Sequence, residues 1–287
     1  MKTETRILLA VTAHPDDETF GMGGTLALYA SRGVSVHLIC ATRGEVGEVD
    51  DQYLQGFSSI GELREHELRC AANTLGLAKV YFLNYRDSGM PNTPENQHPQ
   101  ALIQAPVEQV ARQVAALIRQ IKPQVVLTFD PLGGYQHPDH IAIHKATLRA
   151  FVIAGDNSVN LEGAQAFSPS KLYFHTMPRG FLKLVVKIMP LFRLDPRHFG
   201  SNKDIDLTAV VEQDFPTHAR IDYRSVIDKR NQASACHASQ GGDAGSGYII
   251  TWLMRLLSPT ETYMRAFPPV VGKLNEKDFF WDLKFKD

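Results

Sequence analysis

Two short segments of the sequence concentrate side chains that can bind a metal ion or move a proton. The first is Ala13-His14-Pro15-Asp16-Asp17-Glu18 and the second is Tyr135-Gln136-His137-Pro138-Asp139-His140. Three adjacent carboxylates repel one another unless a cation or hydrogen-bond donors neutralise them. Imidazole and carboxylate groups suit zinc, and a catalytic zinc site has three protein ligands and one position left for water. The two segments therefore predict a catalytic metal site.

Both segments follow apolar runs that predict strands. Strands are expected at 7–12, 34–41, 80–84, 125–129, 171–175 and 206–211, and helices at 24–31, 61–75, 107–121 and 141–152. This alternation predicts an α/β, Rossmann-like fold whose mostly parallel sheet has helices on both faces. Ligands of such sheets bind beyond the carboxyl ends of the strands, which is where both segments lie.

The bulk composition fits one globular domain. The chain has 287 residues, of which 44% are hydrophobic and 21% charged, so we expect a single domain over 1–287. The apolar run at 180–192 predicts an inserted helix around 180–200, packed on the domain; a lid, a dimer contact or a membrane-surface helix are the alternatives. Lysine and arginine number 30 against 31 acidic residues, which disfavours nucleic acid as a ligand.

The cysteines and the hydropathy pattern predict a cytoplasmic location. Cys40, Cys70 and Cys236 are few, scattered and odd in number, so we expect no disulfide framework and a reducing interior. No segment approaches the roughly eighteen apolar residues of a transmembrane helix, and residues 1–6 contain no apolar signal core. Whether the protein forms a homo-oligomer is left open by the sequence.

The two segments resemble the motifs of a known family, the LmbE-like or PIG-L deacetylases. That family carries Ala-His-Pro-Asp-Asp-Glu early and His-x-Asp-His later, both after strands, and the resemblance spans about residues 6–240. It implies an LmbE-like domain that acts as a zinc-dependent N-deacetylase. The implied substrate is an N-acetylglucosamine-type compound, either an N-acylated amino sugar or a conjugate of one. Ferrous iron could use the same ligands.

The resemblance also implies a role for individual residues of the two segments. The metal ligands would be His14, Asp17 and His140. Asp16 would be the general base that accepts a proton from water and delivers it to the leaving amine. His137 and Tyr135 would stabilise the oxyanion. Asp139 can orient an imidazole, and we expect His144 to be structural.

Three residues outside the motifs are candidates for substrate binding. Arg43 lies in the Thr-Arg-Gly-Glu run after the second predicted strand, and Asp87 follows the third strand. The resemblance implies that Arg64 and Asp87 contact sugar hydroxyls, a role that suits the guanidinium fork. Glu67 is expected to form only a surface ion pair. His237 has no clear role beyond closing the site.

Three other interpretations compete with the deacetylase. Gly21-Met22-Gly23-Gly24 lies between a strand and a helix, as a nucleotide-binding loop would, but its spacing differs from the dinucleotide fingerprint and the acidic residues before it would repel phosphate. A metal-dependent phosphoesterase could also use His and Asp clusters. A non-catalytic, sugar-binding member of the family is the third alternative.

Overall fold

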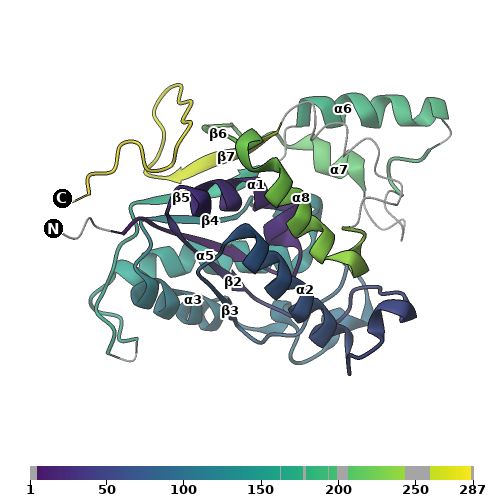
Figure 1. The fold of residues 1–287 in the computed structure, drawn as a ribbon, viewed down its shortest axis with the longest axis horizontal. Helices are drawn as coiled ribbons and strands as arrows, with labels where there is room; N and C mark the ends of the chain where they lie inside the picture. Colours follow the sequence, from purple (N-terminus) through teal and green to yellow (C-terminus); the bar gives the residue numbers. More distant parts are fainter. Residues whose placement is uncertain are drawn as a thin grey trace.

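The computed structural model describes residues 5–161, 163–176, 179–192, 194–198, 206–242 and 259–285. Its centre is a seven-stranded sheet with the order β3-β2-β1-β4-β5-β7-β6 (Figure 1). The strands are β1 (Ile7–Thr12), β2 (Ser35–Cys40), β3 (Lys79–Phe82), β4 (Val125–Phe129), β5 (Lys171–Thr176), β6 (Ala219–Asp222) and β7 (Thr260–Phe267). β1 to β5 are parallel, whereas β7 pairs antiparallel with both β5 and β6.

Helices cover both faces of the sheet. The α-helices are α1 (Asp17–Ser31), α2 (Ile60–Leu75), α3 (Val107–Ile121), α4 (Gly133–Gln136), α5 (Pro138–Gly155), α6 (Arg179–Ile188), α7 (Leu207–Glu212) and α8 (Ile227–Cys236). The 3-10 turns are η1 (Asp51–Leu54), η2 (Pro94–Gln97), η3 (Leu102–Gln104), η4 (Met189–Phe192), η5 (Arg224–Val226) and η6 (Ala238–Gln240). α3 and α5 pack side by side below the sheet in Figure 1, and α1 lies above it beside α8.

The side chains of β1 show why the sheet needs two helical layers. Leu9 and Val11 belong to the cluster formed with α3 and α5, whereas Leu8 and Ala10 belong to the cluster formed with α1. All four side chains are fully buried. A parallel strand that is apolar on both faces must be covered on both, and the predicted α/β, Rossmann-like class is confirmed.

One predicted strand is wrong and two strands were not predicted. The β-branched run expected as a strand at 206–211 forms α7. Asp206 decides this locally, because its carboxylate accepts the backbone N–H and the hydroxyl of Thr208 and its carbonyl accepts the N–H of Val210, as in a helix N-cap. The antiparallel strands β6 and β7 form the far edge of the sheet instead.

The structure contains a disulfide that we did not predict. Cys70 on α2 and Cys236 at the end of α8 are bonded, with Cα atoms 5.8 Å apart and 166 residues between them in sequence. Spacing along the chain did not reveal this pair because the packing of α2 against α8 brings it together. Cys40 is free and buried. We expected no disulfide framework and did not foresee this single bond, so the predicted reducing interior loses its support from the cysteines.

The segment predicted as an insert leaves the sheet after β5. Its described part holds α6 and η4, and Figure 1 shows α6 well away from the sheet. α7 follows the predicted insert and packs against α6. α7 packs against α4, so this excursion reaches the loops that follow β4. None of the helices in the described ranges combines the length and the apolar character that a bilayer crossing requires.

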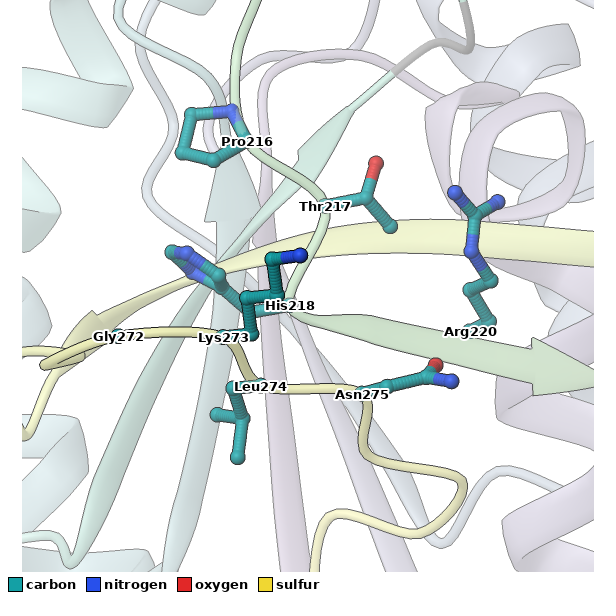
Figure 2. Close-up of a pocket in the computed structure, with 8 residues that line it drawn as sticks. All are labelled: Pro216, Thr217, His218, Arg220, Gly272, Lys273, Leu274 and Asn275. Atoms are coloured by element: carbon teal, nitrogen blue, oxygen red, sulfur yellow. The ribbon is translucent and has the colours of Figure 1, made fainter.

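The opposite side of the sheet ends at β6, where the C-terminal segment runs past. Ala219 and Glu276 form a parallel bridge there. Figure 2 shows the hollow between the two segments, which has a volume of about 430 Å³ and is bordered by His218, Arg220 and Lys273. Exposed or half-buried side chains line this hollow, and β5 and β7 separate it from β4. It is distinct from the place where the predicted site residues gather.

Candidate metal and catalytic site

The strand order places both predicted motifs in one crevice. From β1 the chain moves to β2 on one side, while β4 pairs with the other side of β1. This reversal is a topological switch point, where the loops leaving two adjacent strands diverge and leave an opening. The motif that begins with His14 follows β1, and the motif that ends with His140 follows β4. The fold itself therefore brings the two motifs together.

Three donor groups converge at this point, two buried imidazoles and the half-buried carboxylate of Asp17. His14 Nδ1 lies 3.3 Å from His140 Nε2, and His140 Nε2 lies 3.1 Å from Asp17 Oδ1. His14 Nδ1 and Asp17 Oδ2 are 3.6 Å apart. Tetrahedral coordination with bonds of roughly 2.0–2.2 Å places donor atoms about 3.3 Å from one another. The arrangement and chemistry of these donors fit a small divalent cation such as zinc.

Two further sets of buried groups lie close enough to hold an ion. The members of each set lie within 4.8 Å of one another, and the sets are His14, His137 and His140, and His14, Asp87 and Asp139. The first set lacks a carboxylate, and the Nδ1 of its His137 accepts the backbone N–H of Asp139 at 3.2 Å. The second set is as close, with Asp139 and Asp87 3.1 and 3.5 Å from His14 Nε2. Asp17 joins both histidines through its two carboxylate oxygens, and His14, Asp17 and His140 as the ligand set stay a prediction.

Neighbouring groups hold the two imidazole rings in place. Asp139 Oδ2 is 3.1 Å from His14 Nε2, and Gly133 O is 3.1 Å from His140 Nδ1. The ring of Phe129 stacks on His140 with centroids 3.9 Å apart. Such contacts on the outer nitrogen fix the ring and its tautomer, as in many metal sites. Gly133 has φ 61, and a Cβ there would lie 2.7 Å from His140 Cβ, so a glycine is required.

Asp16 lies beside the donor cluster in an unusual backbone conformation. It has φ 116, and its carboxylate oxygen Oδ2 is 3.1 Å from Arg64 Nη2. Burial raises the pKa of Asp16 to about 6; the Arg64 guanidinium opposes this rise and the Asp17 carboxylate adds to it. A carboxyl group with a pKa near the working pH can both accept and return a proton.

Burial and neighbouring charges shift the pKa values of the cluster's members in different directions. Burial alone would lower the pKa of His14, but Asp87, Asp139 and Asp17 outweigh it and hold that pKa well above its ordinary value. Burial would raise the pKa of Asp17, yet His140 and His14 keep it well below the usual range. The pKa of His137 is lowered by burial and by the neighbouring histidines, which favours a neutral ring. The carboxylate of Asp17 is thus held ionised, whereas that of Asp16 can take up and release a proton near neutral pH.

Tyr135, from the second motif, borders the same space. The ring of Tyr135 lies with its centroid 5.9 Å from that of His137 and 5.2 Å from that of His140. Burial raises the pKa of the Tyr135 hydroxyl, and the charge of Asp17 adds to the rise. Tyr135 therefore keeps its proton and can donate a hydrogen bond, as oxyanion stabilisation requires.

Known proteins share both the sequence and the fold. Residues 9–151 match the family described as PIG-L: GlcNAc-PI de-N-acetylase. A 1D-myo-inositol 2-acetamido-2-deoxy-alpha-D-glucopyranoside deacetylase of Thermobifida fusca is 39% identical over 255 residues, covering 86% of this chain and 87% of its own. The deacetylase of the same name from Rhodococcus erythropolis is 38% identical and covers 99% of both chains. The chain belongs to the PIG-L family.

The predicted resemblance is therefore confirmed, and with it the class of reaction. This PIG-L protein is a deacetylase, a hydrolase that acts on an amide C–N bond. An N,N'-diacetylchitobiose deacetylase from Pyrococcus horikoshii has the same fold, with a TM-score of 0.62, 20% identity, and coverage of 91% of this chain and 84% of that one. At that identity the likeness concerns the fold alone.

Two of the three candidate substrate residues of the PIG-L protein lie at the cluster. Asp87 is buried, and its Oδ1 is 3.5 Å from His14 Nε2. Arg64 is also buried and donates to the carbonyl oxygens of Gly44 and Pro15 as well as to Asp16. The structure thus adds a contact between Arg64 and Asp16. Binding of substrate by Asp87 and Arg64 stays a prediction.

The third candidate, Arg43, has other partners. Its Nε donates to Glu65 Oε2 at 2.5 Å, and its guanidinium lies 5.0 Å from the centroid of the Phe82 ring. The side chain is about one-third exposed, so it keeps access to solvent. A role for Arg43 in substrate binding also remains a prediction.

Two buried acidic residues near the site were not recognised from the sequence. Glu67, expected in a surface ion pair, is buried and accepts the N–H and hydroxyl of Ser239 at 2.8 and 2.7 Å. Glu18 is fully buried and its Oε1 lies 2.7 Å from His237 Nε2. The prediction of a surface ion pair for Glu67 is wrong because its side chain is buried. The sequence did not reveal this because its partner lies 172 residues away. His144 is separate from the cluster and its Nδ1 bonds the carbonyl of Phe129.

Proposed function

We propose that this PIG-L protein removes the acetyl group from an N-acetylglucosaminyl conjugate of inositol, releasing acetate and a free amine. The relatives from Thermobifida and Rhodococcus are named for this substrate, and their likeness extends over most or all of the chain. The observation that carries the mechanism is the convergence of His14, Asp17 and His140 beside Asp16. A simple N-acetylated sugar is the second substrate to test.

We propose zinc as the metal, held by His14, Asp17 and His140, with ferrous iron as the alternative. The separations of the donor atoms, between 3.1 and 3.6 Å, support this assignment. When bound, the metal supplies Lewis-acid activation of water and of the amide carbonyl. Asp139 and Gly133 orient the two imidazole rings for this role.

Asp16 moves the proton in the proposed reaction. As the carboxylate, it accepts a proton from the attacking water, and as the acid it delivers that proton to the amine nitrogen as the C–N bond breaks. A pKa of about 6 keeps most Asp16 carboxyl groups ionised at neutral pH. His137 and Tyr135 donate hydrogen bonds to the oxygen that gains negative charge. Arg43, Arg64 and Asp87 are proposed to contact hydroxyls of the sugar or inositol.

We also propose that residues 1–287 form one deacetylase domain whose excursion around 180–200 borders the substrate. The packing of α6 against α7, and of α7 against α4, supports this, because α4 carries Tyr135. Substrate identity then depends partly on this excursion.

The test is release of acetate by metal-loaded protein from the inositol conjugate and from N-acetylglucosamine. We expect about one metal ion per chain and faster turnover of the conjugate. Asp16→Asn removes the base without changing the size of the side chain, and Asp156→Asn, on the exposed end of α5, is its control. Equal turnover by wild type and Asp16→Asn would contradict the mechanism. Hydrolysis of a phosphate monoester in place of the amide would favour the phosphoesterase.

A further inference from the structure

A fully buried pair, Glu18 and His237, lies directly behind Asp16, and the proposed mechanism does not use it. His237 follows the last residue of α8, and its Nε2 is 2.7 Å from Glu18 Oε1. Neither side chain has any exposed surface. The second oxygen, Glu18 Oε2, accepts the backbone N–H of Asp16 at 3.0 Å. The pair therefore connects the end of α8 to the backbone of the proposed base.

The backbone of Asp16 needs such support. Its φ of 116 is a value that residues with a Cβ rarely adopt, and conformations of this kind persist only when the surroundings hold them. An aspartate before a helix commonly turns its carboxylate onto the free N–H groups of the first turn. Asp16 makes no such bond, and its carboxylate contacts Arg64 instead. Glu18 binds the N–H of Asp16, like the acidic residue of a capping box.

We propose that His237 is a positioning residue for the deacetylation reaction, acting through Glu18 to hold the carboxylate of Asp16 in its productive orientation. This inference rests on the proposed role of Asp16. Among the described residues, Glu18 Oε1 has two partners, the hydroxyl of its neighbour Thr19 and the ring of His237. Of these two partners, His237 is the one from outside the turn that Glu18 supports, so it joins that turn to the end of α8, while Arg64 joins it to α2.

The end of α8 is held independently of the imidazole of His237. On one side, Cys236 is bonded to Cys70 of α2. On the other side, Ser239 donates its N–H and hydroxyl to Glu67 of α2. Removing the ring therefore removes the contact with Glu18 while α8 keeps its place. This separation makes the role of His237 testable apart from the packing of the helix.

Replacing His237 by glutamine or by asparagine tests which of its two ring nitrogens matters. His237→Gln places an amide nitrogen near the position of Nε2, from which it can donate to Glu18, whereas the shorter amide of His237→Asn reaches only the position of Nδ1. His237 Nδ1 is buried and has no hydrogen-bond partner among the described residues, so His237→Asn keeps polarity without restoring the contact. His237→Ala removes both nitrogens.

The experiment measures kcat and KM for acetate release, metal content and thermal unfolding of the metal-loaded full chain. We expect His237→Ala and His237→Asn to lower kcat roughly 10- to 100-fold, because small misplacements of a reacting group cost about this much. KM and metal content should stay near those of wild type. His237→Gln should recover most of the lost kcat. The double variant Cys70→Ser/Cys236→Ser, which loosens α8 but keeps His237, should unfold at a lower temperature with kcat within about threefold of wild type.

Several results would overturn the inference. Wild-type kcat in His237→Asn, an equal loss in His237→Gln, or an equal loss in the cysteine double variant would each show that the contact with Glu18 does not position the base. If His237→Ala does not fold, the kcat values of His237→Asn and His237→Gln are compared instead, and a lower kcat only in His237→Asn supports the inference. Asp16→Asn, measured in parallel, tests the proposed function separately. An inactive Asp16→Asn with fully active His237→Asn would reject only the role of His237.

Discussion

The two segments that build the site achieve their geometry in different ways. Segment 13–19, after β1, depends on distant residues: Arg64 and His237 contact it from positions 48 and 219 residues away in sequence. Segment 133–140, after β4, holds two of its histidine rings through local bonds, because His140 Nδ1 bonds the carbonyl of Gly133 and His137 Nδ1 accepts the N–H of Asp139. Its carboxylate, Asp139, accepts the N–H of the distant Ser88. A segment crowded with carboxylates needs donors from elsewhere in the fold, whereas a histidine-rich turn can satisfy its rings locally.

The largest expected effect tests the first segment. Asp16→Asn should lower kcat by about 1000-fold, within the range for loss of a general acid-base group. The metal should remain bound because Asp17 and the histidine ligands are intact. Steady-state kinetics with metal analysis of the same sample measures both. Retention of more than a tenth of the wild-type kcat would show that proton transfer does not depend on Asp16.

The second prediction separates two histidines of the second segment. His140→Ala should lower metal affinity and, with it, activity, because it removes a ligand. His137→Ala should keep the metal and lower kcat by on the order of 100-fold, as for loss of an oxyanion donor. Metal titration and acetate release distinguish these outcomes. Equal loss of metal in both variants would instead favour the ligand set made of three histidines.

The third prediction concerns the local support of the second segment. Gly133→Ala should weaken metal binding about 10- to 100-fold. The new Cβ would clash with His140 Cβ and move the His140 ring away from the Gly133 carbonyl that orients it. The positive φ adds a loss of stability of about 1–3 kcal/mol. Gly163→Ala, which also has a positive φ but open space around it, is the control and should affect only stability. Unchanged metal affinity in Gly133→Ala would argue against this orientation.

The smallest effect tests the distant support of the first segment. Activity should fall as pH decreases through about 6, because protonated Asp16 cannot accept a proton from water. Arg64→Gln removes the positive charge that lowers the pKa of Asp16, so the acid limb of the kcat profile should move to higher pH. Arg69→Gln, further along α2 and exposed, should leave the limb in place. A limb that does not move in Arg64→Gln would assign it to another group.

Much of the fold could be predicted from the sequence because the parallel strands and their helices carry strong local patterns. The bounds 107–121 and 125–129 agree with α3 and β4. The run at 206–211 was predicted wrongly because its β-branched residues suggest a strand, while the bonds that Asp206 makes decide for a helix. β6 and β7 are antiparallel edge strands whose pairing depends on the rest of the sheet.

The sequence by itself determined the two motifs, their place after β1 and β4, and the deacetylase family. Motif residues lie close together in the chain, and strand order then brings the motifs to one crevice. Only the tertiary structure decided which groups surround Asp16, that Glu67 is buried, and that Cys70 and Cys236 are bonded. These contacts join residues on α2 to the end of α8 and to the turn before α1. Their physical cause is the packing of three helices on one face of the sheet, which no local pattern encodes.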